Sequence, residues 1–172
     1  KIWKMVYREK IDGINVIRTW SYPTHLRSSV KRGLNYASFC FSSALAATFL
    51  KGFDVVICTS PPPFLGLTGL YFSRLTGTPL VFEVRDLWPE VIPAMGVAGE
   101  NSLTYRLFDK LVSALYEKSA IIVAVTESFR MHIAETRGIP IEKIKVIENA
   151  VDTDLFRPQE APPQLSKELH LD

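Results

Sequence analysis

The sequence has few of the residues that usually reveal a metal centre, a disulfide framework or a nucleic-acid surface. Its 172 residues include two cysteines, Cys40 and Cys58, and three scattered histidines without metal-ligand spacing. Both cysteines lie in apolar segments and form no CxxC pair, so we expect reduced, packed thiols. The net charge of +2 is too small to indicate nucleic-acid binding. These shortages argue against a disulfide-stapled fold, a His/Cys metal centre and a nucleic-acid partner.

A glycine-rich phosphate loop is also missing. Gly66 and Gly69 lie inside a helical pattern, without the strand–loop context that such a loop needs. Asp152-Thr153-Asp154 spells the D-x-D that holds a divalent metal in some nucleotide-sugar enzymes. Here it precedes an apolar pair, which is typical of a turn or a helix cap. We therefore expect no metal site and no bound cofactor.

Strand-like and helical segments alternate along the chain. Apolar runs without strict alternation favour strands covered on both faces, as in parallel sheets, and they occupy 14–19, 53–59, 79–84, 120–125 and 144–148. Helical patterns occupy 63–76, 102–118 and 127–137, with caps at Ser102 and Thr126 and stops at Gly77 and Gly138. The alternation predicts an α/β domain with a parallel sheet and helices on both faces.

One long segment, 27–51, does not fit this alternation. It has no charge over the eighteen residues from Gly33 to Leu50, close to the length of a membrane span. Its Ala and Ser content favours a helix packed closely on the sheet, and a helix that partly touches lipid is the alternative. Arg27, Lys31 and Arg32 cluster at its start, either as a solvated helix end or as a basic rim facing anionic lipid or a diphosphate.

Charged and polar side chains follow the expected strands. In open parallel sheets ligands bind at the carboxyl ends of the strands. The stretch VFEVRDLWPE at 81–90 starts as a strand and ends in charges, so those charges are expected where the strand meets a crevice. Glu83 lies deeper and is expected to be structural. The other candidates at the strand ends are Arg85, Asp86, Trp88, Glu90, Ser60, Thr126, Glu127 and Asn149.

The chemistry of these side chains suggests roles at a sugar–phosphate site. The planar fork of Arg85 suits a diphosphate or a carboxylate. Asp86 suits sugar hydroxyls or the role of a base. Trp88 offers a flat apolar face to a sugar or a lipid, or else anchors its own loop.

The carboxyl end of the chain changes character. The run DTDLFRPQEAPPQ after Val151 is rich in proline and charge, which is typical of a linker, and LSKELHLD resembles the beginning of a helix. The chain begins at Lys1 without a signal-peptide pattern. We expect it to be an excised piece of a longer protein in which a second domain follows.

Three stretches resemble the amino-terminal half of the retaining group 1 (family four) glycosyltransferases. They are DVVICTSPPPFLGLTGLYFSRLTGTPLVFEVRDLWPE, AIIVAVTESFRMHI and KIKVIENAVDTDLFRP. The resemblance runs from about Ile11 to Pro158. It is greatest to the bacterial surface-polysaccharide branch related to L-fucosamine transferase, and the SPP and FEVRDLWPE elements are specific to that branch. ENAVD is a loose version of the wider family's N-G-V-D.

The resemblance implies one Rossmann-like half of a GT-B architecture, in which two such domains face each other across a cleft. Residues 1–155 would form a truncated acceptor-side domain, and 156–172 a linker and the start of the donor domain. The family's first strand–helix unit, its Gly-rich loop and its E-x7-E motif are not in this sequence, so this piece alone is expected to be inactive.

The resemblance also implies an activity. The full protein would transfer a hexosyl or acetamidosugar group from a nucleotide-sugar to a lipid-linked glycan, with retention and without a metal, in polysaccharide or O-antigen-type (lipopolysaccharide) biosynthesis. It would act in the cytoplasm, peripherally at the inner face of the membrane. Arg85 and Asp86 would line the reaction crevice, Ser60, Thr126 and Glu127 the acceptor side, and Asn149 the interdomain hinge.

One departure from the family pattern and two alternatives remain. Many members carry a His near the position of Arg85, which leaves a simple His-based role in doubt. A nucleotide-sugar 2-epimerase has the same architecture, but it needs cleft carboxylates and a His. A non-catalytic module that binds a membrane or a partner is the other alternative, and it predicts that Arg85 and Asp86 are dispensable.

Overall fold

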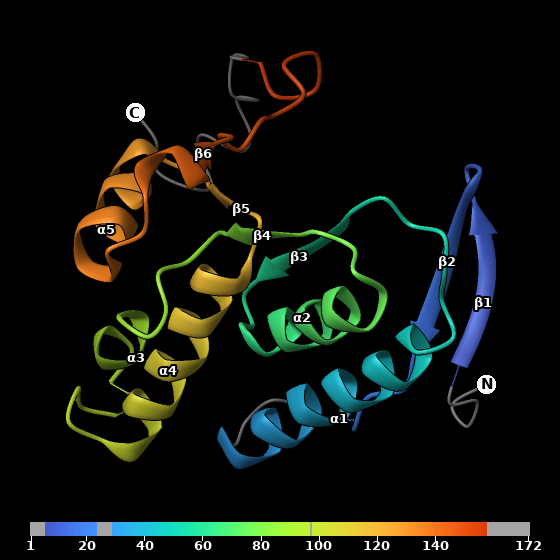
Figure 1. Cartoon of the computed structure of the whole chain (residues 1–172), viewed down its shortest axis with the longest axis horizontal. Coiled ribbons are helices and arrows are strands. Elements are labelled where there is room, and N and C mark those ends of the chain that lie inside the picture. Colours follow the sequence, from blue (N-terminus) through green and yellow to red (C-terminus); the bar gives the residue numbers. More distant parts are fainter. Residues whose placement is uncertain (1–5, 24–28, 97, 158–172) are drawn as a thin grey trace, which may run out of the picture.

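The fold is that of a computed structural model, which describes residues 6–23, 29–96 and 98–157. A two-stranded hairpin lies beside an α/β unit with a four-stranded sheet (Figure 1). The α/β class and the parallel sheet predicted from the sequence are confirmed.

The hairpin consists of β1 (Val6–Ile11) and β2 (Ile14–Thr19), which pair antiparallel. Asp12 and Gly13 turn the chain between them with φ angles of 48° and 85°, the left-handed backbone that a tight hairpin turn requires. The strand predicted at 14–19 is therefore confirmed. It lies outside the parallel sheet, however, because its partner is the preceding strand β1, which the sequence analysis did not predict.

The main sheet has the strand order β3-β4-β5-β6, and all of its pairs are parallel. Its strands are β3 (Val56–Ser60), β4 (Leu80–Val84), β5 (Ile121–Ala124) and β6 (Ile144–Val146). Each lies within a predicted strand or extends one residue beyond it. In the described sheet, β3 forms one edge and β6 the other.

Three long helices follow the strands as predicted. They are α2 (Phe64–Thr76), α4 (Leu103–Lys118) and α5 (Glu127–Arg137). The Ser102 hydroxyl caps α4 by accepting from the Tyr105 amide, and the Thr126 hydroxyl caps α5 by accepting from the Phe129 amide. Gly77 and Gly138 end α2 and α5 in the left-handed conformation. The structure adds two short helices, α3 (Val91–Ala94) and the 3₁₀ turn η1 (Ile141–Lys143).

The core lies on one face of the parallel sheet. Phe82, Ile122 and Ile144 project from adjacent strands in register and pack with Leu70, Leu115 and Ile133 from α2, α4 and α5. On the opposite face Ile57 of β3 is 66% exposed and Ile121 of β5 is 38% exposed. The prediction that the strands are covered on both faces is therefore wrong at β3 in the described part of the chain.

Helix α1 (Ser29–Ala47) is not the buried helix on the sheet that the sequence predicted. It packs against α2 and beside β2 (Figure 1). Ser38 and Ser42 hydrogen-bond to the backbone of Tyr22 and Trp20, and Ser43 lies 3.1 Å from the hydroxyl of Thr68 in α2. The polar residues that interrupt the apolar run thus bond to neighbouring segments. The Ala and Ser content of the helix does not predict which segments these are.

The outer side of α1 is apolar and exposed. Val30, Leu34, Phe41 and Leu45 are 72%, 52%, 70% and 46% exposed, and their spacing of four, seven and four residues places them on one face. We call these four residues the α1 stripe. No helix among the described residues combines the length and the hydropathy needed to cross a membrane.

Candidate functional site

The four parallel strands end at the same level. Ser60, Val84, Ala124 and Val146 are neighbours in the strand register and are the last residues of their strands. Hydrogen bonds continue past this row, because the Arg85 amide donates to the Ser60 carbonyl over 3.0 Å and the Ile147 amide donates to the Ala124 carbonyl over 3.0 Å. The polar residues that follow the strands therefore emerge along one edge of the sheet.

Most of the predicted site residues at this edge are accessible. Ser60 is buried, with 2% exposure, whereas five side chains are exposed, namely Arg85, Asp86, Thr126, Glu127 and Asn149. The Thr126 hydroxyl also accepts from the Phe129 amide over 3.1 Å as the helix cap, and Glu127 pairs with Arg130 at 3.0 Å. Arg85 and Asp86 are exposed at the exit of β4, and their role stays a prediction.

Glu90 faces α4 and α5. Its Oε1 accepts from Arg137 Nη2 over 2.7 Å and lies 3.5 Å from His132 Nε2. Arg137 also donates to Asp109 of α4. Nothing in the sequence pattern brings residues 90, 109 and 137 together, because this contact depends on the packing of two helices. The substrate-binding role predicted for Glu90 stays a prediction, and its observed partner is an arginine.

The electrostatics of this cluster depend on its partial burial. The Arg137 side chain is 13% exposed, whereas those of Glu90 and Asp109 are 32% and 40% exposed. Burial alone would lower the pKa of Arg137, but the hydrogen bond to Asp109 and the charges of Glu90 and Asp109 outweigh it and raise the pKa. Arg137 therefore stays charged and ties the loop after β4 to both helices.

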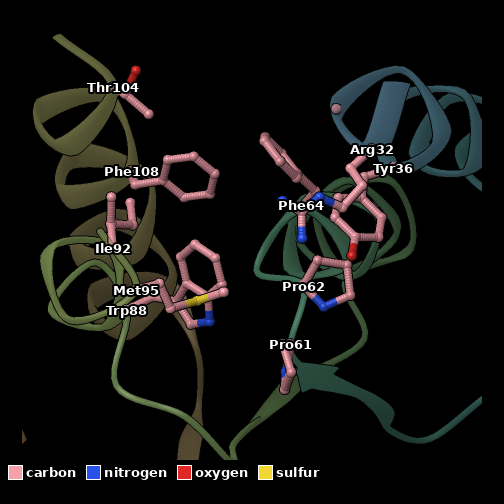
Figure 2. A pocket seen from close by; sticks show the side chains of 11 residues that line it. Arg32, Tyr36, Pro61, Pro62, Phe64, Trp88, Ile92, Met95, Thr104 and Phe108 are labelled. Carbon is pink, nitrogen blue, oxygen red and sulfur yellow. The ribbon is translucent and has the colours of Figure 1, made fainter. Parts of the chain in front are cut away.

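Trp88 lines a cavity of about 280 Å³ (Figure 2). Ile92, Met95 and Phe108 lie with Trp88 on one wall, and Phe64, Tyr36 and Arg32 line the facing wall. Pro61 and Pro62, which directly follow β3, complete the lining. The cavity thus adjoins the same strand exits as Ser60 and Arg85.

The three basic residues predicted at the start of the apolar helix have different positions. Lys31 is exposed, Arg32 lines the cavity, and Arg27 lies outside the described residues. Trp88 and Arg32 could be found from the sequence, but their place in one cavity could not. Phe108 and Met95 were missed because they carry no chemical signature and their segments lie far from 81–90 in the sequence.

Two smaller expectations can be compared with the structure. The Asp152 carboxylate accepts from the amides of Asp154 and Leu155, over 2.9 and 3.3 Å, so the D-x-D stretch forms the predicted turn. Burial raises the pKa of the Cys58 thiol, with a smaller contribution from Cys40. Cys58 thus behaves as a packed thiol.

Comparisons with known proteins show which family the chain is similar to. Residues 4–150 match the family described as Glycosyl transferase 4-like domain. The chain belongs to this family. The chain is also 27% identical over 137 residues to the probable glycosyltransferase WbjE of Pseudomonas aeruginosa. This match covers 78% of the chain and 34% of the relative, so the chain spans about a third of the length of that curated protein. The strand exits and the cavity lie inside the matched family region.

Proposed function

We propose that the full protein is a retaining glycosyltransferase that moves a sugar from a nucleotide-sugar to a lipid-linked glycan, in polysaccharide or O-antigen-type synthesis. The described residues form its acceptor-side domain. The observation that carries this proposal is the row of aligned strand exits, with exposed Arg85 and Asp86 beside an apolar cavity. The family assignment supports glycosyl transfer as the chemistry.

The proposed site works by positioning and by charge. The guanidinium of Arg85 stabilises negative charge that develops as the diphosphate leaves, because it presents a planar fork of donors. Asp86, next to it, accepts from acceptor hydroxyls and orients the attacking oxygen. The leaving diphosphate assists deprotonation of the acceptor on the same face of the sugar, so no covalent enzyme intermediate and no bound metal is needed.

The same proposal places the protein at the inner face of the membrane. The α1 stripe exposes four large apolar side chains on one face. The sequence contains no acidic residue from Gly13 to Phe53, whereas Lys31, Arg32 and Lys51 lie in that interval. An apolar helix face with cations and without acids matches a bilayer that carries anionic lipid.

The test uses the full-length protein with cell membranes and a panel of labelled nucleotide-sugars. Wild type is expected to move label into lipid. Arg85→Ala and Asp86→Ala are each expected to lower transfer by about a hundredfold, the scale for a lost transition-state contact. Lys118→Ala is the matched control, because Lys118 is exposed in the last turn of α4, which leads to the amino end of β5, opposite the strand exits, and transfer should stay within about twofold of wild type.

The alternative outcomes separate the competing functions. Transfer that survives both substitutions makes Arg85 and Asp86 structural and removes the proposed site. An absence of transfer from every donor, combined with interconversion of a nucleotide-sugar, favours an epimerase. An absence of both reactions favours a non-catalytic binding module.

A further inference from the structure

The cavity beside Trp88 has walls that suit a hydrocarbon chain. Phe108 stands between Trp88 and Phe64, with ring centroids 5.1 Å from each. Ile92 and Met95 extend the apolar wall (Figure 2). An engineered apolar cavity of about 150 Å³ holds benzene, so about 280 Å³ has room for a chain of several carbon atoms more. A sugar would leave most of its hydroxyls without partners against these walls, at a cost for each.

The charge on the cavity wall points to the group at the end of that chain. Among the described residues that line the cavity, Arg32 carries the only charge. Lys31 is exposed next to it. A phosphate beside Arg32 would complement this arrangement, whereas a second cation would be repelled.

The cavity also lies at the end of α1 where the α1 stripe begins. Gly33 lines the cavity, and its neighbour Leu34 belongs to the stripe. A lipid chain that lies against this end of α1 is therefore close to the cavity.

We propose that this cavity binds the hydrocarbon chain next to the phosphate of the lipid-linked acceptor, with Arg32 beside that phosphate. The inference rests on the proposed function for the identity of the ligand. It assigns the apolar part of the acceptor to the cavity beside Trp88, and it leaves the sugars to the strand exits at Arg85 and Asp86.

Gly33 provides a direct way to close the cavity. Gly33 lines the cavity, and a Cβ built there has no neighbour within 4 Å, so a larger side chain displaces no atoms. Leucine also forms helices better than glycine does, so Gly33→Leu should fold at least as well as wild type. Thr104→Phe fills the cavity from the exposed start of α4 and serves as a second, independent variant. Gly99→Leu is the matched control, because a Cβ at Gly99 also meets nothing within 4 Å and Gly99 does not line the cavity.

The experiment measures binding of octyl phosphate to the full-length protein by calorimetry, below the micelle-forming concentration and without any sugar donor. We expect saturable binding in wild type and in Gly99→Leu. In Gly33→Leu and in Thr104→Phe the affinity should fall by at least about tenfold, because burial of several methylene groups is lost. Arg32→Gln should weaken octyl phosphate but leave 1-octanol unchanged.

The outcomes distinguish this inference from the proposed function. Unchanged octyl phosphate binding in both filled variants overturns the cavity assignment, even when sugar transfer is intact. Binding of inorganic phosphate as tight as that of octyl phosphate also overturns it, because the chain then contributes nothing. A third outcome is that the filled variants lose octyl phosphate binding while the wild-type protein transfers no sugar. That result supports the cavity assignment and refutes the glycosyltransferase proposal.

Discussion

At the scale of single residues, Arg137, the last residue of α5, links three segments of the chain. Its guanidinium binds Glu90 and Asp109, so one side chain connects the loop after β4, α4 and α5. Among the described residues its side chain bonds to Asp109, Ser113 and Glu90, so we expect it to affect Arg85 and Asp86 only through the loop that carries Glu90. We regard it as a positioning residue.

Replacing Arg137 by Met is expected to destabilise the protein by about 1–3 kcal/mol, because two partly buried carboxylates lose their partner. Arg130→Met in the same helix is the control, since in the described part of the chain Arg130 pairs only with Glu127, whose side chain is 59% exposed, and the expected loss is under about 0.5 kcal/mol. Urea denaturation of both variants measures the difference. Equal losses would show that the Arg137 cluster is no stronger than a surface pair.

A positioning role also has a kinetic signature. If Arg137 holds the loop that carries Arg85 and Asp86, Arg137→Met lowers kcat in the transfer assay, and Arg137→Lys restores part of it because one charged contact is kept. A purely structural role would leave kcat of the folded fraction unchanged.

At the scale of elements, α2 packs closely on β3. A Cβ at Gly69 of α2 would lie 2.2 Å from the Cys58 Sγ and 3.0 Å from Leu80 Cδ1. The glycine therefore lets the helix approach the sheet, and the two glycines of GLTG serve packing in place of phosphate binding.

Gly69→Ala is expected to cost about 1–3 kcal/mol by overpacking, despite the better helix propensity of alanine. Cys58→Ala should recover part of that cost in the double variant, because it removes the atom that the new methyl group meets. Thermal or urea unfolding of the two single variants and the double variant gives the coupling energy. A coupling near zero would contradict the close contact at Cys58.

The elements that could be predicted from the sequence are those with local signals. The caps at Ser102 and Thr126 and the stops at Gly77 and Gly138 placed α2, α4 and α5 within one residue. β1 was missed because Arg8, Glu9 and Lys10 interrupt its apolar pattern, and α3 because it is four residues long and contains Pro93. The packing of α1 depends on its contacts with α2 and β2, which a local sequence pattern does not predict.

The candidate site divides in the same way. Strand exits follow from strand order along the chain, so Ser60, Arg85 and Asn149 could be found without coordinates. The cavity and the Arg137 cluster could not, because each needs side chains from helices whose relative positions are set by tertiary packing.

At the scale of the whole molecule, charge is distributed unevenly. Asp54 is the sole acidic residue of the sequence between Gly13 and Phe82, whereas the other acids lie at the hairpin or after β4 begins. Helices α1 and α2 therefore contain three cations and no acid, whereas α4 and α5 contain four acids.

This asymmetry predicts binding to anionic vesicles. The full-length protein is expected to sediment with vesicles that contain phosphatidylglycerol, and less so as salt screens the cations. Phe41→Ser in the α1 stripe should weaken binding by about tenfold, because a large apolar group is lost from the interface.

The matched control for this prediction is Leu107→Ser on α4, where Leu107 is 59% exposed but lies outside the stripe. It should leave vesicle binding within about twofold of wild type. Equal loss in both variants, or binding that ignores salt, would contradict a membrane-facing α1.

The open face of β3 has a consequence for how the protein is made. In the described sheet β3 is an edge strand, on which Ile57 is 66% exposed, and neighbouring Val55 is 45% exposed. Unpaired backbone groups beside apolar side chains form a template for pairing with another chain. A newly synthesised chain passes through a stage in which this edge competes between its own partners and other nascent chains, so the soluble yield depends on synthesis rate, temperature and chaperone supply.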